Sequence, residues 1–290
     1  MKIVLFLLNK KGHDCLNLLI ESNFYTENLE FTIVLDRDKG NVEDFYKQMV
    51  SLCLKNKISF FDRKDYVSEN VDFGIAIGWR RLIYGIDRLV VLHDSILPKY
   101  RGFSPLVNML IKGEKEIGVT ALLANEEMDK GKIITQSKVS IEYPIKIKDA
   151  IDVITEVYKK VFNHLIEKIS LGEELKSYHQ NESQATYSVW RDELDYFIDW
   201  SDDAENIKRF VDAVGYPYSG AKTRIGNDII TINDVELVED LKFELVHVGK
   251  IIMMKADNPI VVCGKGAIVI NSSELNNIDY NYKKLRVRFK

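Results

Sequence analysis

Clustered cysteines and long hydrophobic runs are both missing from this chain of 290 residues. Its three cysteines, Cys15, Cys53 and Cys263, lie far apart and form neither a disulfide framework nor a metal-ligand pattern. They are typical of reduced thiols in a cytoplasmic protein. No apolar run is long enough to span a membrane. The short apolar start MKIVLFLL precedes NKKGHD rather than a small-residue cleavage site, which favours a first strand over a signal peptide.

A strong net charge is also missing, because the formal charge is only -4 at pH 7. Proteins that bind nucleic acid nonspecifically need a concentrated positive field, so we expect no nucleic-acid partner. The sequence contains no G-x-G-x-x-G fingerprint and no Walker loop, which argues against enzymes that use nicotinamide dinucleotides or ATP. No His, Cys and carboxylate cluster has metal-ligand spacing, so we expect no metal.

What the first half does contain is an alternation of strand and helix patterns. Continuous apolar runs over 2–8, 31–36, 57–62, 71–79 and 88–93 predict strands, and 15–22 and 43–56 predict helices between them. Continuous apolar strands are typical of a parallel sheet that is covered on both faces. The fold class predicted here is therefore α/β, with a Rossmann-like, mostly parallel sheet and helices on both sides.

The pattern changes in the second half. A helix is predicted from Ser104 and Pro105, followed by strands at 117–125 and 132–142, the second of them antiparallel, and by an amphipathic helix over 147–169. The polar stretch 170–188 then predicts a boundary between a domain of residues 1–180 and one of residues 181–290. A helix at 204–214 and short strands over 223–271 predict a smaller, mostly β domain that resembles an OB-like barrel.

The segment HDSILPKYRGFSP (93–105) follows one of the apolar strands directly. Ligands of open α/β sheets bind outside the carboxyl ends of the strands, and GWRRLI and NEEMDKGKI follow two further strands. A histidine, with an unperturbed pKa of about 6.5, suits acid and base chemistry near neutral pH. Pro98 fixes its own backbone angle and stiffens the loop. Considered separately, each residue also fits a purely structural role: His93 as a hydrogen-bonded polar residue at a strand end, and Asp129 as a turn residue before Gly131.

Taken together, these segments resemble the folate-dependent formyltransferases, and among them the bacterial N-formyltransferases of nucleotide-linked amino sugars. That family carries Asn-x-His-x-Ser-x-Leu-Pro-x-x-Arg-Gly, then a Gly-x-Thr strand, then Met-Asp-x-Gly-x-Ile. The matching residues here are His93, Ser95, Leu97, Pro98, Arg101, Gly102, Gly118, Thr120, Met128, Asp129, Gly131 and Ile133. WRRLI (79–83), QATYSVW, IDW and YPYSGA extend the likeness over roughly residues 72–222.

The resemblance implies transfer of a formyl group from N10-formyltetrahydrofolate to an amine, without a metal. It implies that His93 is the acid or base and that Asp129 is its partner. The implied folate-binding residues are Trp79, Arg80, Leu82, Ile83, Asn125, Glu126 and Glu127. The implied residues for the second substrate are Arg81, Lys99, Arg101, Tyr216 and Tyr218, the two tyrosines stacking on a base.

Two positions depart from the family pattern. Val91 stands where the family has an asparagine, and Asp94 stands where many members have proline or glycine. Loss of one oxyanion donor typically costs about 2.7–4 kcal/mol of transition-state stabilisation. A backbone N–H, a water, cationic His93, or the amide of Asn108 or Asn125 could replace it. We hypothesise that His93 with Asp129 supports turnover.

The amine acceptor separates the branches of the family. A second domain of roughly 100 residues argues against the single-domain glycinamide ribonucleotide branch. Acidic stretches at 191–205 and 234–244 argue against the methionyl-tRNA branch, whose second domain meets RNA. We expect a UDP- or dTDP-linked amino-dideoxy sugar, used for bacterial lipopolysaccharide or another surface glycan, in a protein that could form a homodimer. Methionyl-tRNA formylation, or non-catalytic binding of folate or a sugar nucleotide, remains the alternative.

Overall fold

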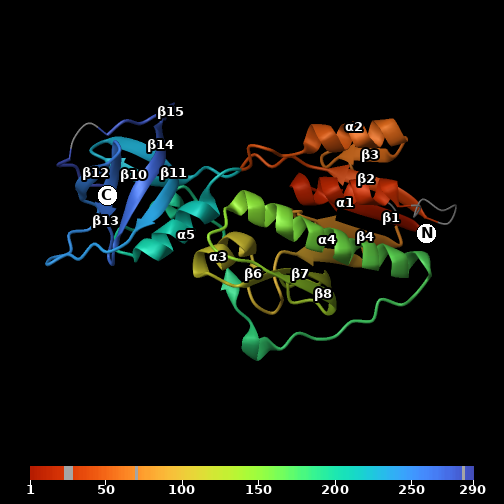
Figure 1. Cartoon of the computed structure of the whole chain (residues 1–290). Helices are drawn as coiled ribbons and strands as arrows, with labels where there is room; N and C mark the ends of the chain where they lie inside the picture. The colour runs from red at the N-terminus through yellow and green to blue at the C-terminus, as the bar shows by residue number, and fades with distance from the viewer. Residues whose placement is uncertain (23–28, 69–70, 283–284) are drawn as a thin grey trace. The chain divides into compact units, whose positions relative to one another are not determined.

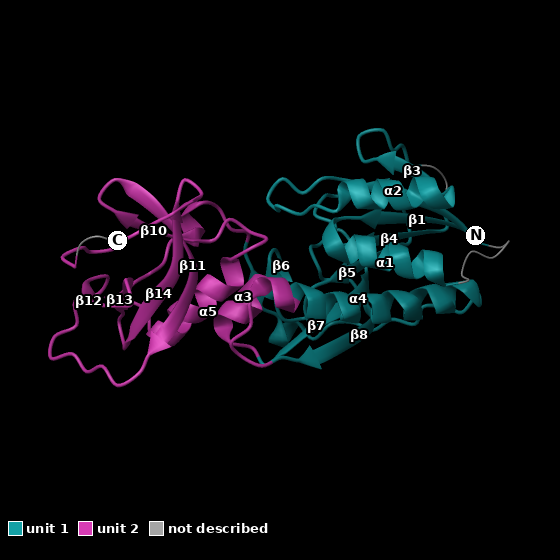
Figure 2. Ribbon diagram, turned by 45° about the horizontal axis from the view of Figure 1, so that its top comes forward, with its two compact units in different colours: residues 1–106, 115–141, 151–189 teal, residues 107–114, 142–150, 190–290 magenta. Residues whose placement is uncertain are grey.

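The computed structural model describes residues 1–22, 29–68, 71–282 and 285–290. Internal contacts divide the chain into two compact units, coloured separately in Figure 2. The N-terminal unit consists of residues 1–106, 115–141 and 151–189, and the C-terminal unit of residues 107–114, 142–150 and 190–290. Residues 181–189 thus contact the N-terminal unit, although the polar composition of 170–188 predicts a boundary at residue 181.

A single sheet forms the centre of the N-terminal unit. Its strands are β1 (Lys2–Leu7), β2 (Glu30–Leu35), β3 (Ser59–Asp62), β4 (Phe73–Ile77), β5 (Leu89–His93), β7 (Glu116–Leu123) and β8 (Ile133–Ser140). The spatial order is β3-β2-β1-β4-β5-β7-β8. The first five strands run parallel, whereas β7 and β8 are antiparallel to their neighbours. The mostly parallel sheet predicted from the apolar runs is confirmed, and β8 pairs antiparallel with β7, as predicted.

Helix α1 (Asn9–Glu21) begins earlier than the sequence pattern predicts. Residues 9–14 precede the helix predicted over 15–22, but they form its first turns. Gly12 explains the difference, because a Cβ at this position would lie 2.9 Å from the Cβ of Leu7. Without that atom the helix can lie directly on β1, with Cys15, Leu16 and Leu19 buried.

Helix α2 (Tyr46–Asn56) and most of α4 (Ile147–Ser170) belong to this unit, whereas α3 (Pro105–Lys112) lies mostly in the C-terminal unit. Helices α1 and α4 lie side by side (Figure 1), and the Nζ of Lys10 is 3.5 Å from the Oδ1 of Asp152. The helices predicted at Pro105 and over 147–169 are confirmed, because a proline at the first helical position and a 3.6-residue apolar period are both present there.

An irregular segment, rather than a helix, covers the other face of β1, β2 and β4. The buried residues on that face are Val4, Phe6, Val34 and Ala76. Side chains of the segment between β4 and β5 pack on them, and the rings of Phe6 and Trp79 are 5.3 Å apart. The described residues 78–88, which connect β4 to β5, form no helix. Because this connection is short, its bulky side chains cover this face of the sheet in place of a helix.

The C-terminal unit is mostly β, as predicted, and its strands form an antiparallel sheet. Its strands are β10 (Ala221–Ile225), β11 (Asp228–Val238), β12 (Ile251–Lys255), β13 (Asn258–Val262), β14 (Ala267–Leu275) and β15 (Ile278–Asp279). The order is β10-β11-β14-β13-β12, with β15 paired to β14. Helix α5 (Ala204–Val214) buries Ile207, Val211 and Val214. The Trp200 ring stacks on Phe289 with centroids 5.1 Å apart.

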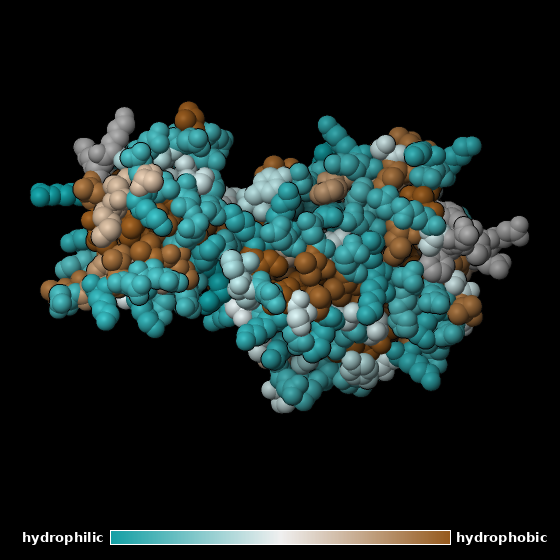
Figure 3. All heavy atoms as spheres, in the orientation of Figure 1, coloured by the Kyte–Doolittle hydropathy of each residue, from teal (hydrophilic) through white to brown (hydrophobic). Residues whose placement is uncertain are grey.

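Polar and apolar side chains mix over the face in Figure 3, where the apolar ones form scattered groups. None of the helices in the described part of the chain is both long and apolar enough to cross a bilayer. All three cysteines are buried free thiols, and burial raises the pKa of Cys53 and of Cys263 to about 12.

Candidate functional site

His93 is the last residue of β5, and it lies beside Asp129 from the loop between β7 and β8. The Nδ1 of His93 is 3.6 Å from the Oδ2 of Asp129, and its Nε2 is 2.8 Å from the carbonyl oxygen of Tyr100. A carbonyl only accepts hydrogen bonds, so Nε2 carries the proton and Nδ1 faces the carboxylate. The two side chains are 8% and 13% exposed. The structure therefore brings together the two residues that the sequence singles out for acid and base chemistry.

The loop after His93 is held by Thr120, a buried residue of β7 that pairs with His93 in the sheet. The Thr120 hydroxyl donates to the carbonyl of Ser95 at 2.6 Å and accepts from the amide of Leu97 at 3.1 Å. Gly118, two residues earlier, leaves room for the loop, because a Cβ there would lie 2.3 Å from the Cδ1 of Ile96. The Gly-x-Thr pattern thus fixes the loop that follows the histidine.

Asp129 is held by the backbone around it. Its φ is +54°, a left-handed conformation that non-glycine residues rarely adopt. The amide of Gly102 donates to Oδ2 at 2.7 Å, so the same oxygen that faces His93 is fixed by a main-chain donor. A Cβ at Gly131 would lie 1.6 Å from the carbonyl oxygen of Leu123. Only glycine fits at that position, which explains the glycine of the Met-Asp-x-Gly pattern.

Arg101 is fully buried, and its guanidinium contacts other residues of the N-terminal unit. It donates to both carboxylate oxygens of Glu182, at 2.8 and 2.7 Å, and to the Oε1 of Gln180 at 3.1 and 2.8 Å. The hydrogen bond to Glu182 raises the pKa of Arg101 and holds the pKa of Glu182 below its usual value. These contacts give Arg101 a structural role, and the substrate contact implied by the family resemblance stays a prediction.

Asp94 follows His93 and points to a different set of partners. It hydrogen-bonds with the ammonium of Lys11 at the start of α1 and with the hydroxyl of Tyr158 in α4. Burial alone would raise the pKa of Asp94, but the charge of Lys11 and these hydrogen bonds outweigh it and hold the pKa below its usual value. Lys11 and Tyr158 are not predicted from the sequence, although the unusual Asp94 is a visible signal.

The residues predicted to hold folate divide between the sheet and the surface. Trp79 and Ile83 pack, with Val91, against the apolar cluster of Val4, Phe6, Val34 and Ala76. The Nε1 of Trp79 is buried and has no hydrogen-bond partner among the described residues. Leu82 is 78% exposed.

The two neighbouring arginines are paired with aspartates that follow β2. Arg80 lies 2.9 Å from Asp38, and Arg81 lies 3.3 Å from Asp36. Both guanidinium groups are about half exposed, at 48% and 57%, so they can still reach an anion in solvent.

A cavity of about 370 Å³ opens in the N-terminal unit next to the predicted pterin loop. It is lined by Asp87, Arg88, Leu89, Leu123, Ala124, Glu174, Leu175 and Ser177. The following residues, Asn125, Glu126 and Glu127, are exposed. The Oδ1 of Asn125 accepts from the amide of Glu127 at 3.1 Å, so the loop has a defined turn.

The remaining predicted residues are divided between the two units. Lys99 is exposed in the N-terminal unit. Tyr216 and Tyr218 belong to the C-terminal unit, where Tyr216 is 46% exposed and lies under the Nζ of Lys148 at 5.8 Å. Asn108 is also in that unit, and its Oδ1 accepts from the Nη2 of Arg191 at 2.9 Å.

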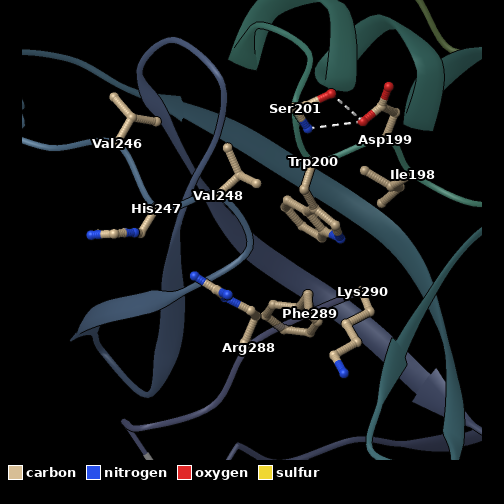
Figure 4. A pocket seen from close by; sticks show the side chains of 10 residues that line it. All are labelled: Ile198, Asp199, Trp200, Ser201, Val246, His247, Val248, Arg288, Phe289 and Lys290. Carbon is tan, nitrogen blue, oxygen red and sulfur yellow. Dashed lines mark hydrogen bonds between the residues drawn. The ribbon is translucent and has the colours of Figure 1, made fainter.

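A second cavity, of about 520 Å³, lies in the C-terminal unit. Its floor includes Trp200 and Phe289, but Figure 4 shows His247 and Lys290 pointing away from Trp200. Asp199 is already paired with Ser201 at 2.6 Å. The polar groups therefore do not converge on one point, as they do in most ligand sites. Over the described part of both units, no three His, Cys, Asp or Glu side chains gather in a way that could hold a metal ion.

Comparison with known families matches both units. The family described as "Formyl transferase" matches residues 64–164, and "Formyl transferase, C-terminal domain" matches residues 192–279. The chain belongs to the formyl transferase family. The matched N-terminal region contains both His93 and Asp129.

Relatives in this formyl transferase family differ in the acceptor that their names indicate. A methionyl-tRNA formyltransferase of Kosmotoga olearia is 31% identical over 180 residues, which are 62% of this chain and 57% of that protein. A bifunctional polymyxin resistance protein ArnA of Wigglesworthia glossinidia brevipalpis is 30% identical over 243 residues, 76% of this chain and 36% of that protein. The chain thus spans little more than half the length of the methionyl-tRNA relative and about a third of ArnA.

Solved structures share the fold of the whole chain. The sugar 3N-formyl transferase WlaRD, determined with dTDP and 5-N-formyl-THF, has a TM-score of 0.69 at 20% identity and covers 96% of this chain and 98% of its own. An N-formyltransferase from Helicobacter canadensis, in complex with folinic acid and dTDP-3-aminofucose, has a TM-score of 0.72 at 16% identity and covers 97% and 100%. At these identities the likeness establishes the fold.

Proposed function

We propose that this protein transfers a formyl group from N10-formyltetrahydrofolate to the amine of a UDP- or dTDP-linked amino-dideoxy sugar. The observation that carries the proposal is the approach of His93 to Asp129, at 3.6 Å, at the carboxyl end of β5. Membership of the formyl transferase family supports the reaction. The likeness over nearly the whole chain to sugar N-formyltransferases supports the acceptor class.

His93 would manage the proton that the reaction displaces. The amine nitrogen forms a bond to the formyl carbon, the bond from that carbon to N10 of the folate breaks, and one amine proton must leave. Since Nε2 donates to Tyr100, the atom free to take that proton is Nδ1. Asp129 would stabilise the imidazolium that forms, and the proton then passes to N10 of the departing tetrahydrofolate.

The folate would lie against Trp79, Ile83 and Val91, which are partly buried apolar side chains at this face of the sheet. The backbone of Asn125, Glu126 and Glu127 would meet the polar edge of the pterin. N10-formyltetrahydrofolate supplies the formyl group when bound, and the protein residues hold its pterin ring flat and exclude water.

The C-terminal unit favours a nucleotide sugar over tRNA as the acceptor. Between residues 191 and 205 it carries the exposed carboxylates Asp192, Glu193, Asp195, Asp199, Asp202, Asp203 and Glu205. Carboxylates repel the phosphates of an RNA backbone, whereas proteins that bind RNA concentrate lysine and arginine. Because methionyl-tRNA formyltransferases are among the relatives, charged initiator tRNA is the second candidate for the acceptor.

Purified protein should be incubated with N10-formyltetrahydrofolate and, in parallel, UDP- and dTDP-linked 3-amino and 4-amino sugars and charged initiator tRNA. Mass spectrometry of the products should detect a formylated sugar and unchanged methionyl-tRNA. Formylated tRNA without formylated sugar would replace our proposal with the second candidate. Calorimetric binding of folate or of a sugar nucleotide without any product would indicate a binding protein in which Val91 has removed the catalytic amide.

A further inference from the structure

Gln180 holds the backbone on both sides of the residue after Asp129. Its Nε2 donates to the carbonyl of Asp129 at 2.6 Å and to the carbonyl of Gly131 at 2.8 Å. Its Oε1 accepts from Nε and Nη2 of Arg101. Only one orientation of the amide satisfies these contacts, because the reverse would set donors against the guanidinium and an acceptor against two carbonyls.

Arg101, which donates to the Oε1 of Gln180, is itself held in place. Arg101 is fully buried and is held by a two-pronged pair with Glu182. Charged, two-pronged pairs of this kind are short and directional. The guanidinium donors of Arg101 are therefore fixed in position relative to Gln180, although Glu182 itself is exposed.

The main chain of residues 100–102 contacts both Asp129 and His93. Gly102, next to Arg101, donates to the Oδ2 of Asp129 at 2.7 Å. Thr186 accepts from the amide of Tyr100 through its hydroxyl at 2.9 Å. The carbonyl of Tyr100 is the partner of His93 Nε2. Gln180 and Thr186 thus support both members of the pair.

Asp129 needs this support because its backbone is strained. A non-glycine residue at positive φ costs of the order of 1 kcal/mol or more, and it persists only where its surroundings hold it. The hydrogen bonds of Gln180 act on the carbonyl of Asp129 itself and on the carbonyl of Gly131, which flank Lys130. Without them, the loop has less reason to keep Oδ2 facing His93.

We propose that Gln180 is a positioning residue that sets the carboxylate of Asp129 against His93. This inference rests on the proposed formyl transfer. Gln180 and Thr186, which lie in the polar stretch at the predicted domain boundary, therefore support the reacting centre and are not part of a linker.

The Gln180→Glu substitution tests the proposal, because a carboxylate can still accept from Arg101 but would repel the carbonyls of Asp129 and Gly131. We expect kcat to fall about 100-fold, the scale of an error of roughly 1 Å in position, while KM for both substrates changes less than about threefold. Gln184→Glu is the matched control, since Gln184 is an exposed glutamine of the same segment, and it should leave kcat unchanged.

A purely structural role would lower the melting temperature of Gln180→Glu and leave the kcat of the folded fraction unchanged, which would overturn the proposal. A crystal structure of the variant provides a measurement that needs no activity: we expect the separation of Nδ1 and Oδ2 to grow by about 1 Å. An unchanged separation would overturn the positioning role even if the wild type proved inactive, whereas an inactive wild type alone would overturn only the proposed formyl transfer.

If Gln180→Glu does not fold, Gln180→Met, which fills the space but donates nothing, takes its place. Failure of both variants to fold would also overturn the proposal.

Discussion

The Nδ1 of His93 and the Oδ2 of Asp129 are 3.6 Å apart, and Oδ2 also accepts from the amide of Gly102 at 2.7 Å. The histidine is fixed from its other side by the carbonyl of Tyr100. An imidazole and a carboxylate held in this way can share the charge of a proton that arrives at Nδ1. Two distant segments of the chain meet at this point only because the sheet places the end of β5 beside β7.

Replacing either member of this pair should remove most of the proposed activity. We expect His93→Gln and Asp129→Asn to lower the kcat of formyl transfer by about 10²–10⁴-fold, the usual contribution of general acid–base catalysis. Steady-state kinetics with the best sugar acceptor measures the change, and circular dichroism checks that each variant is folded.

His179→Gln is the control for these two variants, because His179 is an exposed histidine of the same unit. It should retain wild-type kcat. Full activity of Asp129→Asn would contradict the role assigned to the carboxylate.

Val91 allows a test of whether the missing family amide has been replaced. We expect Val91→Asn to raise kcat less than about 100-fold, because loss of one oxyanion donor costs 10²–10³ in rate only where nothing compensates. The amide should also lower stability by about 1–3 kcal/mol, since Val91 packs among Leu97, Leu122 and Ile133. Kinetics and urea unfolding measure the two effects, with Val91→Ala as the control for lost packing. A larger gain in kcat would mean that the natural protein lacks an oxyanion donor.

Asp94 should make stability depend on acidity at low pH. Its pKa is lowered in the folded state, so its contribution to stability is fully present above the unfolded value of about 3.9 and is lost as the pH falls through the folded value. Asp94→Asn should therefore flatten the loss of stability below about pH 4. At pH 7 it should cost about 3–5 kcal/mol, because Lys11 would be left buried and unpaired.

Urea unfolding at several pH values tests this prediction. Asp152→Asn is the matched control, because Asp152 is 52% exposed where it pairs with Lys10, and such pairs are worth less than about 1 kcal/mol. Equal pH profiles for Asp94→Asn and the wild type would show that the Lys11 pair does not couple folding to protonation.

Local patterns in the sequence predict several elements of this structure, whereas contacts between residues distant in the sequence could not be predicted. The strands and the pair of His93 with Asp129 could be predicted, because apolar runs and short motifs carry them. The early start of α1 depended on one close approach, that of Gly12 to Leu7. Lys11 and Tyr158 contact Asp94, and Gln180 contacts the loop that carries Asp129, from segments that are distant in the sequence. No periodicity or motif in those segments indicates these contacts.

Gly131 provides the sharpest test of the loop that carries Asp129. A Cβ at this position would lie 1.6 Å from the carbonyl oxygen of Leu123, so the backbone of one strand or of the loop must move. We expect Gly131→Ala to destabilise the protein by more than about 3 kcal/mol, at the large end for single substitutions, and to abolish turnover in whatever fraction folds. Gly172→Ala is the control: its φ is +68° but nothing lies within 4 Å of the added atom, so it should cost only about 1 kcal/mol. Calorimetry and kinetics on both variants separate a clash from backbone strain. If the two glycine variants lost equal stability, the close approach of Gly131 to Leu123 would not be what holds the loop.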